Sequence, residues 1–420
     1  MTIEDGIARS EPAVTTRSCG DRAMVAAGTP RVLCLDLEGG WGGSSRSLYY
    51  LIRSRVPEWW QPVIVTRRPG PIAGRYKTLA VAQLCIPEMP AFRPSERNNP
   101  VAFALFLWGL RHLPAIMRRL RALVAEHRIE LIHVNHESLA LCGLIAARRL
   151  GLPWVCHVRT QLIPGIFARL VYRLINRHAA GIVFIAEPNR AHFARLVGRA
   201  FDGAKTCVIH NPAPAIDPDS TPLPALSEPA EALRVLSLTN FSPNRGVDRI
   251  VEVAAMLKRR GRDDVVFFLC GALANTRRLP GARNRYLEDM QRRVEAEGLA
   301  ATVRFPGHVD EPERAVLACH ALIKLTRQSN PWGRDIIEAM TAGLPVITLG
   351  AFQGFVEDGV NGFIDRDYDP ARIADHLIRL RDAPDLRRRI SHANRDKARS
   401  LFDGRACASR MAAVYAKVIG

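Results

Sequence analysis

The stretch Asn330–Ile347, NPWGRDIIEAMTAGLPVI, predicts one helix followed by one strand. Asn330 suits the N-cap because its side chain accepts a hydrogen bond from a free backbone N–H, and Pro331 suits the first helical position. Gly343 can adopt the left-handed conformation that ends a helix, and Pro345 prevents the helix from continuing. We therefore expect a helix that starts at Asn330 and Pro331 and ends at Gly343.

Apolar segments flank this helix on both sides. Residues 321–325 read as a buried strand and residues 346–349 as the next strand, so the unit is strand, loop, helix, strand. Its loop lies where the end of a strand meets the N-terminus of a helix, and the free backbone N–H groups there favour an anionic ligand. Glu338 lies within the helix, where a lone glutamate is ordinarily a solvated surface residue.

The same alternation of strands and helices recurs in both halves of the chain. It predicts an α/β protein of two doubly wound domains around a cleft. Residues 212–232 are rich in proline, which is typical of a linker. We expect a flexible tail at residues 1–29, a first domain at 30–212, a linker at 213–232, a second domain at 233–395 and a final helix at 396–420.

The charge of the chain favours anionic partners. Among 420 residues, 59 are Lys or Arg and 41 are Asp or Glu, so the formal net charge is +18. Nucleic acid is the least favoured partner, because the basic residues are dispersed and no recognised binding module is present. The nine cysteines are scattered and residues 1–29 lack the apolar core of a signal peptide, which predicts a cytoplasmic protein.

Residues 101–124 combine apolar and aromatic side chains with several arginines. One interpretation is a long helix whose apolar stripe packs on a sheet, and base rates favour it. The other is a basic, aromatic surface that dips into an anionic membrane, peripheral at the inner face. The uncharged run Val101–Leu110 is expected to be too short to cross a bilayer.

Two histidines, His133 and His157, lie close to the ends of predicted strands. A histidine in such a place is more often structural than functional. No carboxylate–histidine spacing nearby completes a metal site, so we expect no bound metal.

The stretch from residue 330 onward resembles the donor-site signature of the retaining glycosyltransferases of family 4, which have the GT-B fold of two Rossmann-like domains. Their pattern is Glu-x-Phe-Gly-x-x-x-x-Glu-Ala-Met, and Trp332 stands here for the Phe. Asn330 replaces the first Glu. The residues that match are Gly333, Glu338, Ala339, Met340, Gly343 and Pro345.

Further segments resemble this family in the expected order. The glycine-rich turn with Gly42 and Gly43 follows the first strand, and His157 occupies the place of a histidine that follows a Gly-x-Pro turn. The family pattern Arg-Leu-x-x-x-Lys-Gly-x-Asp corresponds to residues 240–248. There Asn240 replaces the Arg and Arg245 replaces the Lys.

The resemblance implies roles for these residues. Glu338 would bind the ribose hydroxyls of a nucleotide, and the backbone of Gly333, Arg334 and Asp335 would face the transferred sugar. Asn330 would contact a sugar hydroxyl, and His157 the donor sugar or the reacting centre. A guanidinium grips phosphate oxygens in pairs, so Arg245 remains a clamp for the diphosphate, and Arg334 is a candidate for the charge lost at Asn240. The acceptor side would include Gly42, Gly43 and His133.

The resemblance thus implies a retaining, metal-independent, hexosyltransferase-like enzyme without a cofactor. It would move a sugar from a nucleotide-sugar donor to a glycan or lipid-linked acceptor, in cell-envelope polysaccharide synthesis, and its last helix would pack back on the first domain. Two alternatives stay open. One is a non-catalytic GT-B protein that binds nucleotide-sugar, and the other is a nucleotide-sugar epimerase.

Overall fold

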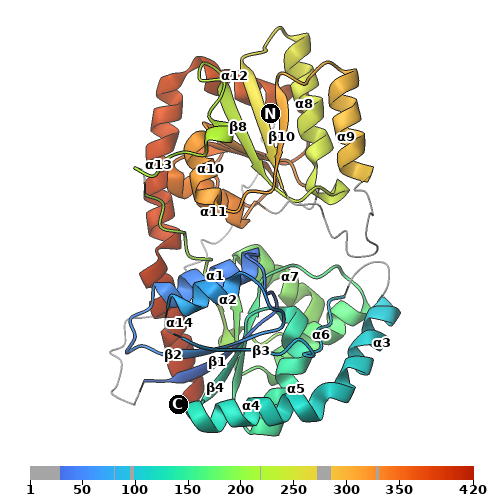
Figure 1. Ribbon diagram of the computed structural model, residues 1–420, viewed down its shortest axis with the longest axis vertical. Helices are drawn as coiled ribbons and strands as arrows, with labels where there is room; N and C mark the ends of the chain where they lie inside the picture. Colours follow the sequence, from blue (N-terminus) through green and yellow to red (C-terminus); the bar gives the residue numbers. More distant parts are fainter. Residues whose placement is uncertain (1–28, 80, 95–98, 218, 272–284, 328–330) are drawn as a thin grey trace, which may run out of the picture.

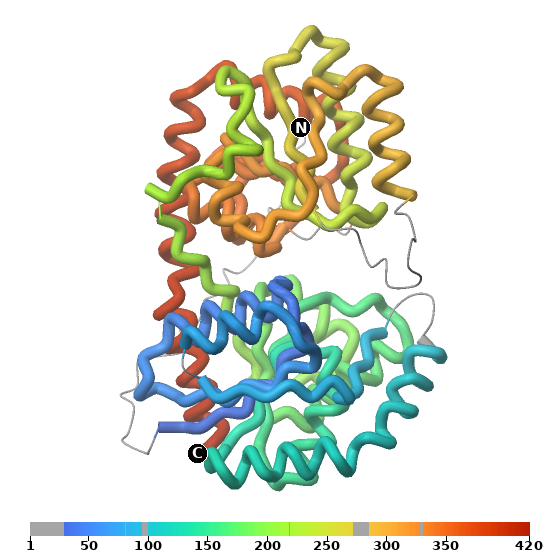
Figure 2. The backbone as a smooth tube through the Cα atoms, viewed as in Figure 1, coloured from blue at the N-terminus to red at the C-terminus, as the bar shows by residue number. Residues whose placement is uncertain are grey.

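The computed structural model describes residues 29–79, 81–94, 99–217, 219–271, 285–327 and 331–420. Residues 1–28 of the predicted tail and Asn330 lie outside these ranges. Figure 1 shows two α/β bodies, one above the other, with the first half of the chain in the lower body. One pair of helices, α13 Pro384–Phe402 and α14 Gly404–Ile419, runs along the side of both bodies, and the tube in Figure 2 follows this path.

The lower body contains a seven-stranded parallel sheet in the order β3-β2-β1-β4-β5-β6-β7. Its central strands are almost entirely apolar, because helices cover both faces and leave no solvated side. The strands are β1 Arg31–Asp36, β2 Gln61–Thr66, β3 Ala82–Cys85, β4 Leu131–Val134, β5 Trp154–Val158, β6 Gly181–Phe184 and β7 Thr206–Val208.

Helices cover the two faces of this sheet unequally. The first two helices and α14 share a core with one face, and the remaining helices share a core with the other. The helices of the lower body are α1 Gly43–Arg53, α2 Ile72–Lys77, α3 Asn99–Gly109, α4 Leu113–His127, α5 Ala140–Leu150, α6 Ile166–His178 and α7 Glu187–Val197.

Helices α3 and α4 form the continuous helical stretch expected from residues 101–124, with one 3-10 turn between them. The packing on the core is confirmed for α4, where Ile116, Met117 and Leu120 are buried. Helix α3 differs, because Leu105 and Trp108 are both 65% exposed. The apolar stripe therefore continues into the core in α4 but faces outward along much of α3.

The uncharged run Val101–Leu110, which is too short by itself to cross a bilayer, lies within a longer helical stretch. In the described residues, the helical stretch Pro100–His127 is long and apolar enough to cross a membrane by length and composition alone. One such helix is weak evidence for a span.

The upper body contains a six-stranded parallel sheet in the order β10-β9-β8-β11-β12-β13. The strands are β8 Leu233–Leu238, β9 Val265–Cys270, β10 Val303–Gly307, β11 Ala321–Lys324, β12 Val346–Leu349 and β13 Gly362–Asp365. The helices are α8 Val247–Arg259, α9 Arg285–Ala296, α10 Pro312–Ala318, α11 Arg334–Ala342, α12 Pro370–Asp382 and α13 Pro384–Phe402.

The unit around residues 321–349 follows the expected order of β11, α11 and β12. Gly343 has a φ of 87° and is the C-cap, as predicted. The predicted helix start was wrong: α11 begins at Arg334 and its N-cap is Gly333. Both Pro331 and Trp332 lie in a turn before the helix.

The last helix, α14 Gly404–Ile419, packs back on the lower body, as the resemblance implied. Its Met411 and Tyr415 join a core that contains residues of β4 and β5. The break before it falls at Asp403, whose carboxylate accepts a hydrogen bond from the Ala406 N–H. Helix α13 therefore runs through residue 396, where a separate final helix was expected to begin.

Candidate active site between two sheets

The two sheets each have one point at which the order of the strands reverses. In the lower sheet it lies between β1 and β4, and in the upper sheet between β8 and β11. In open parallel sheets, ligands bind outside the carboxyl ends of the strands at such points. Helix α1 follows β1 and helix α11 follows β11, and side chains of these two helices contact each other. The two reversal points therefore meet across one interface.

The N-terminus of α11 is built around Gly333. Its backbone is extended, and no side chain caps the helix. A Cβ atom at this position would collide with the Lys324 ammonium and the Asp335 carboxylate. The Ile336 N–H donates a hydrogen bond to Asp335 Oδ1 over 3.1 Å, and the N–H groups before it remain suited to an anionic group.

Lys324 was missed in the sequence, where residues 321–325 were treated as an apolar run. It is the last residue of β11, it is buried, and its ammonium donates a hydrogen bond to Asp335 Oδ1 over 2.8 Å. A lysine at the end of an otherwise apolar strand was the available signal. Lys324 places a cation directly beneath the first turn of α11.

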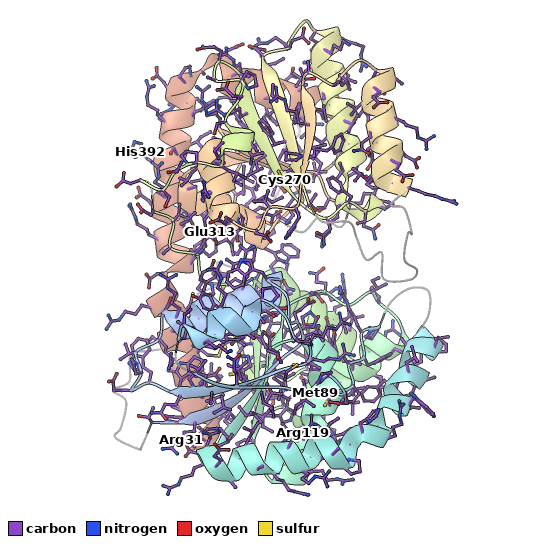
Figure 3. The ribbon with its side chains drawn as sticks, in the orientation of Figure 1. Arg31, Met89, Arg119, Cys270, Glu313 and His392 are labelled. Carbon is purple, nitrogen blue, oxygen red and sulfur yellow. The ribbon has the colours of Figure 1, made fainter. Side chains whose placement is uncertain are left out.

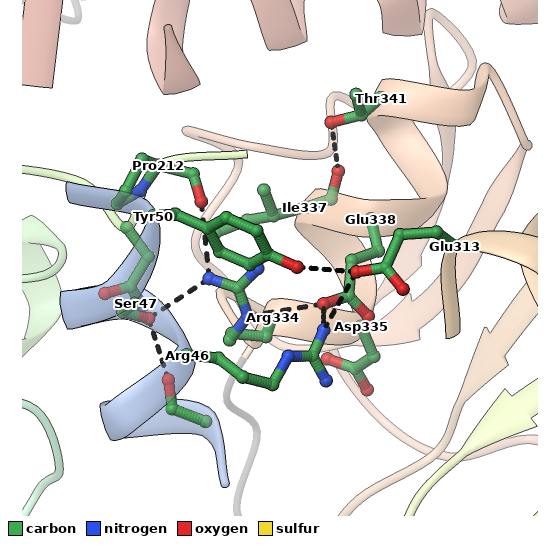
Figure 4. A network of polar contacts seen from close by, with 12 residues as sticks. Arg46, Ser47, Tyr50, Pro212, Glu313, Arg334, Asp335, Ile337, Glu338 and Thr341 are labelled. Carbon is green, nitrogen blue, oxygen red and sulfur yellow. Dashed lines mark hydrogen bonds and ion pairs between the residues drawn. The ribbon is translucent and has the colours of Figure 1, made fainter. Parts of the chain in front are cut away.

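Glu338 is not a solvated surface residue, because only 2% of its side chain is exposed. Its Oε1 accepts a hydrogen bond from Arg334 Nε over 3.2 Å. The same oxygen accepts a hydrogen bond from Arg46 Nη2, which comes from α1 in the lower body. The carboxylate therefore joins both bodies (Figure 4).

Arg334 points from α11 toward the lower body. Its Nη1 donates hydrogen bonds to Ser47 Oγ over 3.1 Å and to the Pro212 carbonyl over 3.3 Å. The guanidinium lies 5.0 Å from the centroid of the Tyr50 ring. Burial, together with the nearby Arg46 guanidinium, lowers the pKa of Arg334 to about 9, so it remains a cation at neutral pH.

Glu313 of α10 completes this interface. It accepts a hydrogen bond from the Tyr50 hydroxyl over 2.6 Å, and its Oε1 lies 4.0 Å from Arg46 Nη2. Figure 3 shows Glu313 at the edge of the upper body that faces the lower one. Burial lowers the pKa of Arg46, and the nearby Tyr50 and Glu313 partly oppose that effect.

Arg245 ends a single 3-10 turn after β8, and Asn240 is exposed on the same loop. The next residue, Gly246, has a φ of 69°, and a Cβ atom there would collide with the Leu325 carbonyl oxygen. This close approach brings the loop after β8 beside the loop after β11. Within the described residues, the Arg245 side chain has no hydrogen bond or ion pair.

The lower body carries a buried polar network that the sequence did not reveal. Asp36 ends β1 and accepts hydrogen bonds from Asn135 Nδ2 over 2.9 Å and from the Tyr76 hydroxyl over 3.1 Å. Arg159 follows β5 and donates to the Asn135 carbonyl over 2.8 Å and to Asn211 Oδ1 over 2.7 Å. The signal was available, since Asp36, Asn135 and Arg159 each lie at the carboxyl end of a strand.

Burial shifts the pKa values within this network. It raises the pKa of Asp36, against the effect of its hydrogen bonds. It lowers the pKa of Arg159 to about 10, while Asp36 and Glu137 act in the opposite direction.

His133 and His157 are each the last residue but one of their strands, β4 and β5, so they lie close to the strand ends as predicted. Both are inside strands, are buried, and face the side of the sheet that α14 covers. His133 Nδ1 lies 2.6 Å from the Tyr415 hydroxyl, and the two imidazole rings are stacked 5.6 Å apart. Strand β5 ends at Val158, so the first side chain beyond its end is Arg159.

The glycines of the first turn lie at the interface. Gly42 is the N-cap of α1 and Gly43 its first residue. A Cβ atom on Gly43 would lie 3.8 Å from Arg334 Cδ. Among the described residues, no three His, Cys, Asp or Glu side chains gather in a way that could hold a metal ion.

Comparisons with known proteins match both halves of the chain. Residues 42–212 match the family described as glycosyl transferase 4-like domain, and residues 224–397 match glycosyl transferases group 1. The D-inositol 3-phosphate glycosyltransferase of Streptomyces griseus is 28% identical over 68% of this chain and 66% of its own length. The alpha-D-kanosaminyltransferase of Streptomyces kanamyceticus is 26% identical over 44% of this chain and 45% of its own length. The matched regions thus span less than two thirds of these relatives.

Solved structures share the fold. The crystal structure of Anabaena HepE in complex with UDP has a TM-score of 0.71 and 20% identity, and the match covers 92% of this chain and 99% of that one. The sucrose-phosphate synthase of Thermosynechococcus elongatus has a TM-score of 0.69 and 18% identity, over 92% and 98% of the two chains. With its two parallel sheets and both family matches, the chain belongs to the group 1 glycosyltransferases of the GT-B fold, similar to family 4.

Proposed function

We propose that the protein is a retaining, metal-independent glycosyltransferase that moves a hexose from a nucleotide-sugar to a glycan or lipid-linked acceptor in cell-envelope polysaccharide synthesis. The observation that carries the proposal is the meeting of two strand-order reversal points, with α1 on one side and the N-terminus of α11 on the other. HepE was crystallised with UDP and with UDP-glucose, which supports a uridine nucleotide as the first donor to test.

The donor diphosphate would lie at the N-terminus of α11, where the N–H groups of the first turn and nearby cations favour negative charge. Arg245, Arg334 and Lys324 are among the cations at this end of the sheet. They would stabilise the leaving diphosphate without a metal ion or cofactor. Glu338 would accept hydrogen bonds from the ribose hydroxyls, and Asn330 would contact the sugar.

The acceptor would approach from the lower body, past Gly42, Gly43 and the N-terminus of α1. A direct role for His157 stays a prediction. It requires the ring to leave its packing against His133, whereas Arg159 already lies at the end of β5. Closure of the two bodies would exclude water and limit hydrolysis of the donor.

The test is a thermal-shift panel of nucleoside diphosphates and nucleotide-sugars in metal-free buffer. A ligand that binds the native state raises its melting temperature. We expect one nucleotide family to stabilise the protein, with the effect lost in Glu338→Ala and kept in Glu295→Ala, which changes an exposed glutamate of α9. Absence of any shift in the unmodified protein would contradict the donor site.

A binding-only protein remains the second candidate, because Asn240 carries no charge and Glu338 is already engaged by two arginines. Release of free nucleotide from a nucleotide-sugar, followed by chromatography, would exclude that candidate. Inversion at C2 of free UDP-GlcNAc would instead identify an epimerase.

We also propose that the cytoplasmic protein is peripheral at the inner membrane face, supported by the outward face of α3. Leu105 and Trp108 are exposed there, and the Arg111 guanidinium lies 4.2 Å from the centroid of the Trp108 ring. Ile166 at the start of α6 is also exposed. Sedimentation with anionic vesicles, reduced in Trp108→Ser and weak with neutral vesicles, is the expected result. Equal binding to both vesicle types would contradict it.

A further inference from the structure

The interface between the two bodies is held by side chains of α1 from below and of α10 and α11 from above (Figure 4). Arg46 contacts Glu338, Tyr50 contacts Glu313, and Ser47 contacts Arg334. We call this set of six side chains the interdomain clasp. It includes Glu338, the carboxylate that would bind the ribose hydroxyls of the donor in the proposed function.

In the clasp, Glu338 has no room for a ribose. Only 2% of its side chain is exposed, and both arginines contact the same oxygen, Oε1. Both contacts use Oε1, but the whole carboxylate is enclosed between the two bodies. A ribose hydroxyl can therefore reach either carboxylate oxygen only when an enclosing side chain such as Arg46 moves away.

The two contacts of Glu338 are not equivalent. Arg334 precedes Glu338 by one turn of the same helix, so their contact persists when the two bodies separate. Arg46 belongs to the other body, and its contact is lost as soon as the bodies separate. Arg46 Nε is buried without a hydrogen-bond partner among the described residues, so its pairing within the interface is incomplete.

We propose that Arg46 is a positioning residue that holds the place of the nucleotide ribose on Glu338 in the ligand-free protein, and that the donor must displace it. This inference rests on the proposed function. Its consequence is that the Arg46–Glu338 contact subtracts from the affinity for the nucleotide. Tyr50 and Glu313 oppose displacement indirectly, because they hold the two bodies together without touching Glu338.

The test is calorimetric titration of UDP, the probe suggested by the HepE complexes, into metal-free unmodified protein, Arg46→Gln and Arg53→Gln. Arg53 ends the same helix and is exposed, so it is the matched control. We expect Arg46→Gln to bind UDP about tenfold more tightly, equivalent to about 1.4 kcal/mol. Arg53→Gln should bind like the unmodified protein. A purely structural role for Arg46 would not tighten binding.

Unchanged or weaker binding of UDP by folded Arg46→Gln would overturn the proposal. Tyr50→Phe is the second variant if Arg46→Gln does not fold, since it removes the hydroxyl bond to Glu313 and leaves Glu338 untouched. It should tighten binding by about fivefold, since a single hydrogen bond contributes about 1 kcal/mol. An unchanged or weaker affinity in Tyr50→Phe would count against the proposal as well.

A readout without nucleotide separates this inference from the proposed function. If no nucleoside diphosphate binds the unmodified protein or any variant, the donor-site proposal fails. Hydrogen exchange of α11 in ligand-free protein then still tests the clasp. Faster exchange in Arg46→Gln than in Arg53→Gln would support the clasp, and equal exchange would overturn it.

Discussion

The two strand-order reversal points hold their buried charges in different ways. In the lower body, Asp36 and Arg159 are joined through Asn135, and every partner belongs to the same body. In the upper body, Glu338 is paired with Arg334 of its own helix and with Arg46 of the other body. The first network is complete in one folded unit, whereas the second depends on how the two units meet. The Asp36–Arg159 network therefore keeps its contacts when the two bodies move apart, whereas the Arg46–Glu338 contact is lost. We call the Asp36–Arg159 network the rigid floor of the lower body.

The largest effect is expected from Arg159→Leu. This change removes the guanidinium that binds Asn135 and Asn211 and the buried positive charge near Asp36 and Glu137, so the free energy of unfolding should fall by about 3 to 5 kcal/mol. Urea denaturation followed by circular dichroism measures it. Arg121→Ala, an exposed position on α4, should change the value by less than about 0.5 kcal/mol. Equal losses in both variants would refute the idea of a rigid floor.

Gly246→Ala tests the close approach of two loops in the upper body. The φ of 69° strains any other residue, and the added methyl would collide with the Leu325 carbonyl. We expect a loss of about 2 kcal/mol in the free energy of unfolding, together with weaker nucleotide binding. Gly261→Ala is the control, because it has the same φ and open space around it. If both variants lose the same stability, the φ alone is responsible and the loop contact is not.

Acidification should weaken the lower body through its buried histidines. Burial lowers the pKa of His133 from 6.5 to about 3, so below pH 6.5 the unfolded chain binds a proton that the folded chain does not. Stability from this group is therefore present above pH 6.5 and is lost as the pH falls toward 3, by up to about 1.4 kcal/mol per pH unit. Denaturation at several pH values should show a shallower slope in His133→Gln than in His392→Gln, which changes an exposed histidine. Equal slopes in the two variants would contradict a contribution of His133 to the loss of stability at low pH.

The smallest effect is expected from Arg46→Gln. When the two bodies separate, water can hydrate Glu338, so the variant should lose only about 1 kcal/mol in the free energy of unfolding. The measurement is the urea denaturation used for Arg159→Leu. A loss as large as in Arg159→Leu would show that the Arg46–Glu338 contact is structural and would remove the contrast between the two networks.

The sequence predicted the alternating strands, the unit of β11, α11 and β12, and the cap at Gly343, because these follow from local patterns. It misplaced the start of α11, because Pro331 and Trp332 fit a turn as well as a first helical turn. It placed His157 close to the end of its strand, which is confirmed, but it overlooked Arg159, two residues further on. Local pattern alone does not show which of these neighbouring side chains faces the core and which joins a network beyond the strand.

Contacts between distant segments could not be predicted in this way. Arg46 and Glu338 are 292 residues apart, and nothing in either local pattern refers to the other. Lys324 was missed because of its immediate neighbours: they are apolar, and the whole segment was therefore interpreted as a buried apolar strand. The roles proposed for Glu338, Arg245 and Asn330 come from the resemblance and remain predictions.

The path of α14 constrains the order in which the chain can fold during synthesis. Tyr415 and Met411 complete the core on one face of the lower sheet, beside residues of β4 and β5. Domains usually fold as units while the ribosome extends the chain, beginning with the N-terminal one. Here the first body cannot close its core until the second has been translated and α14 has emerged. We therefore expect the nascent first half to expose an apolar face until α14 arrives, and exposed apolar surface is what chaperones bind.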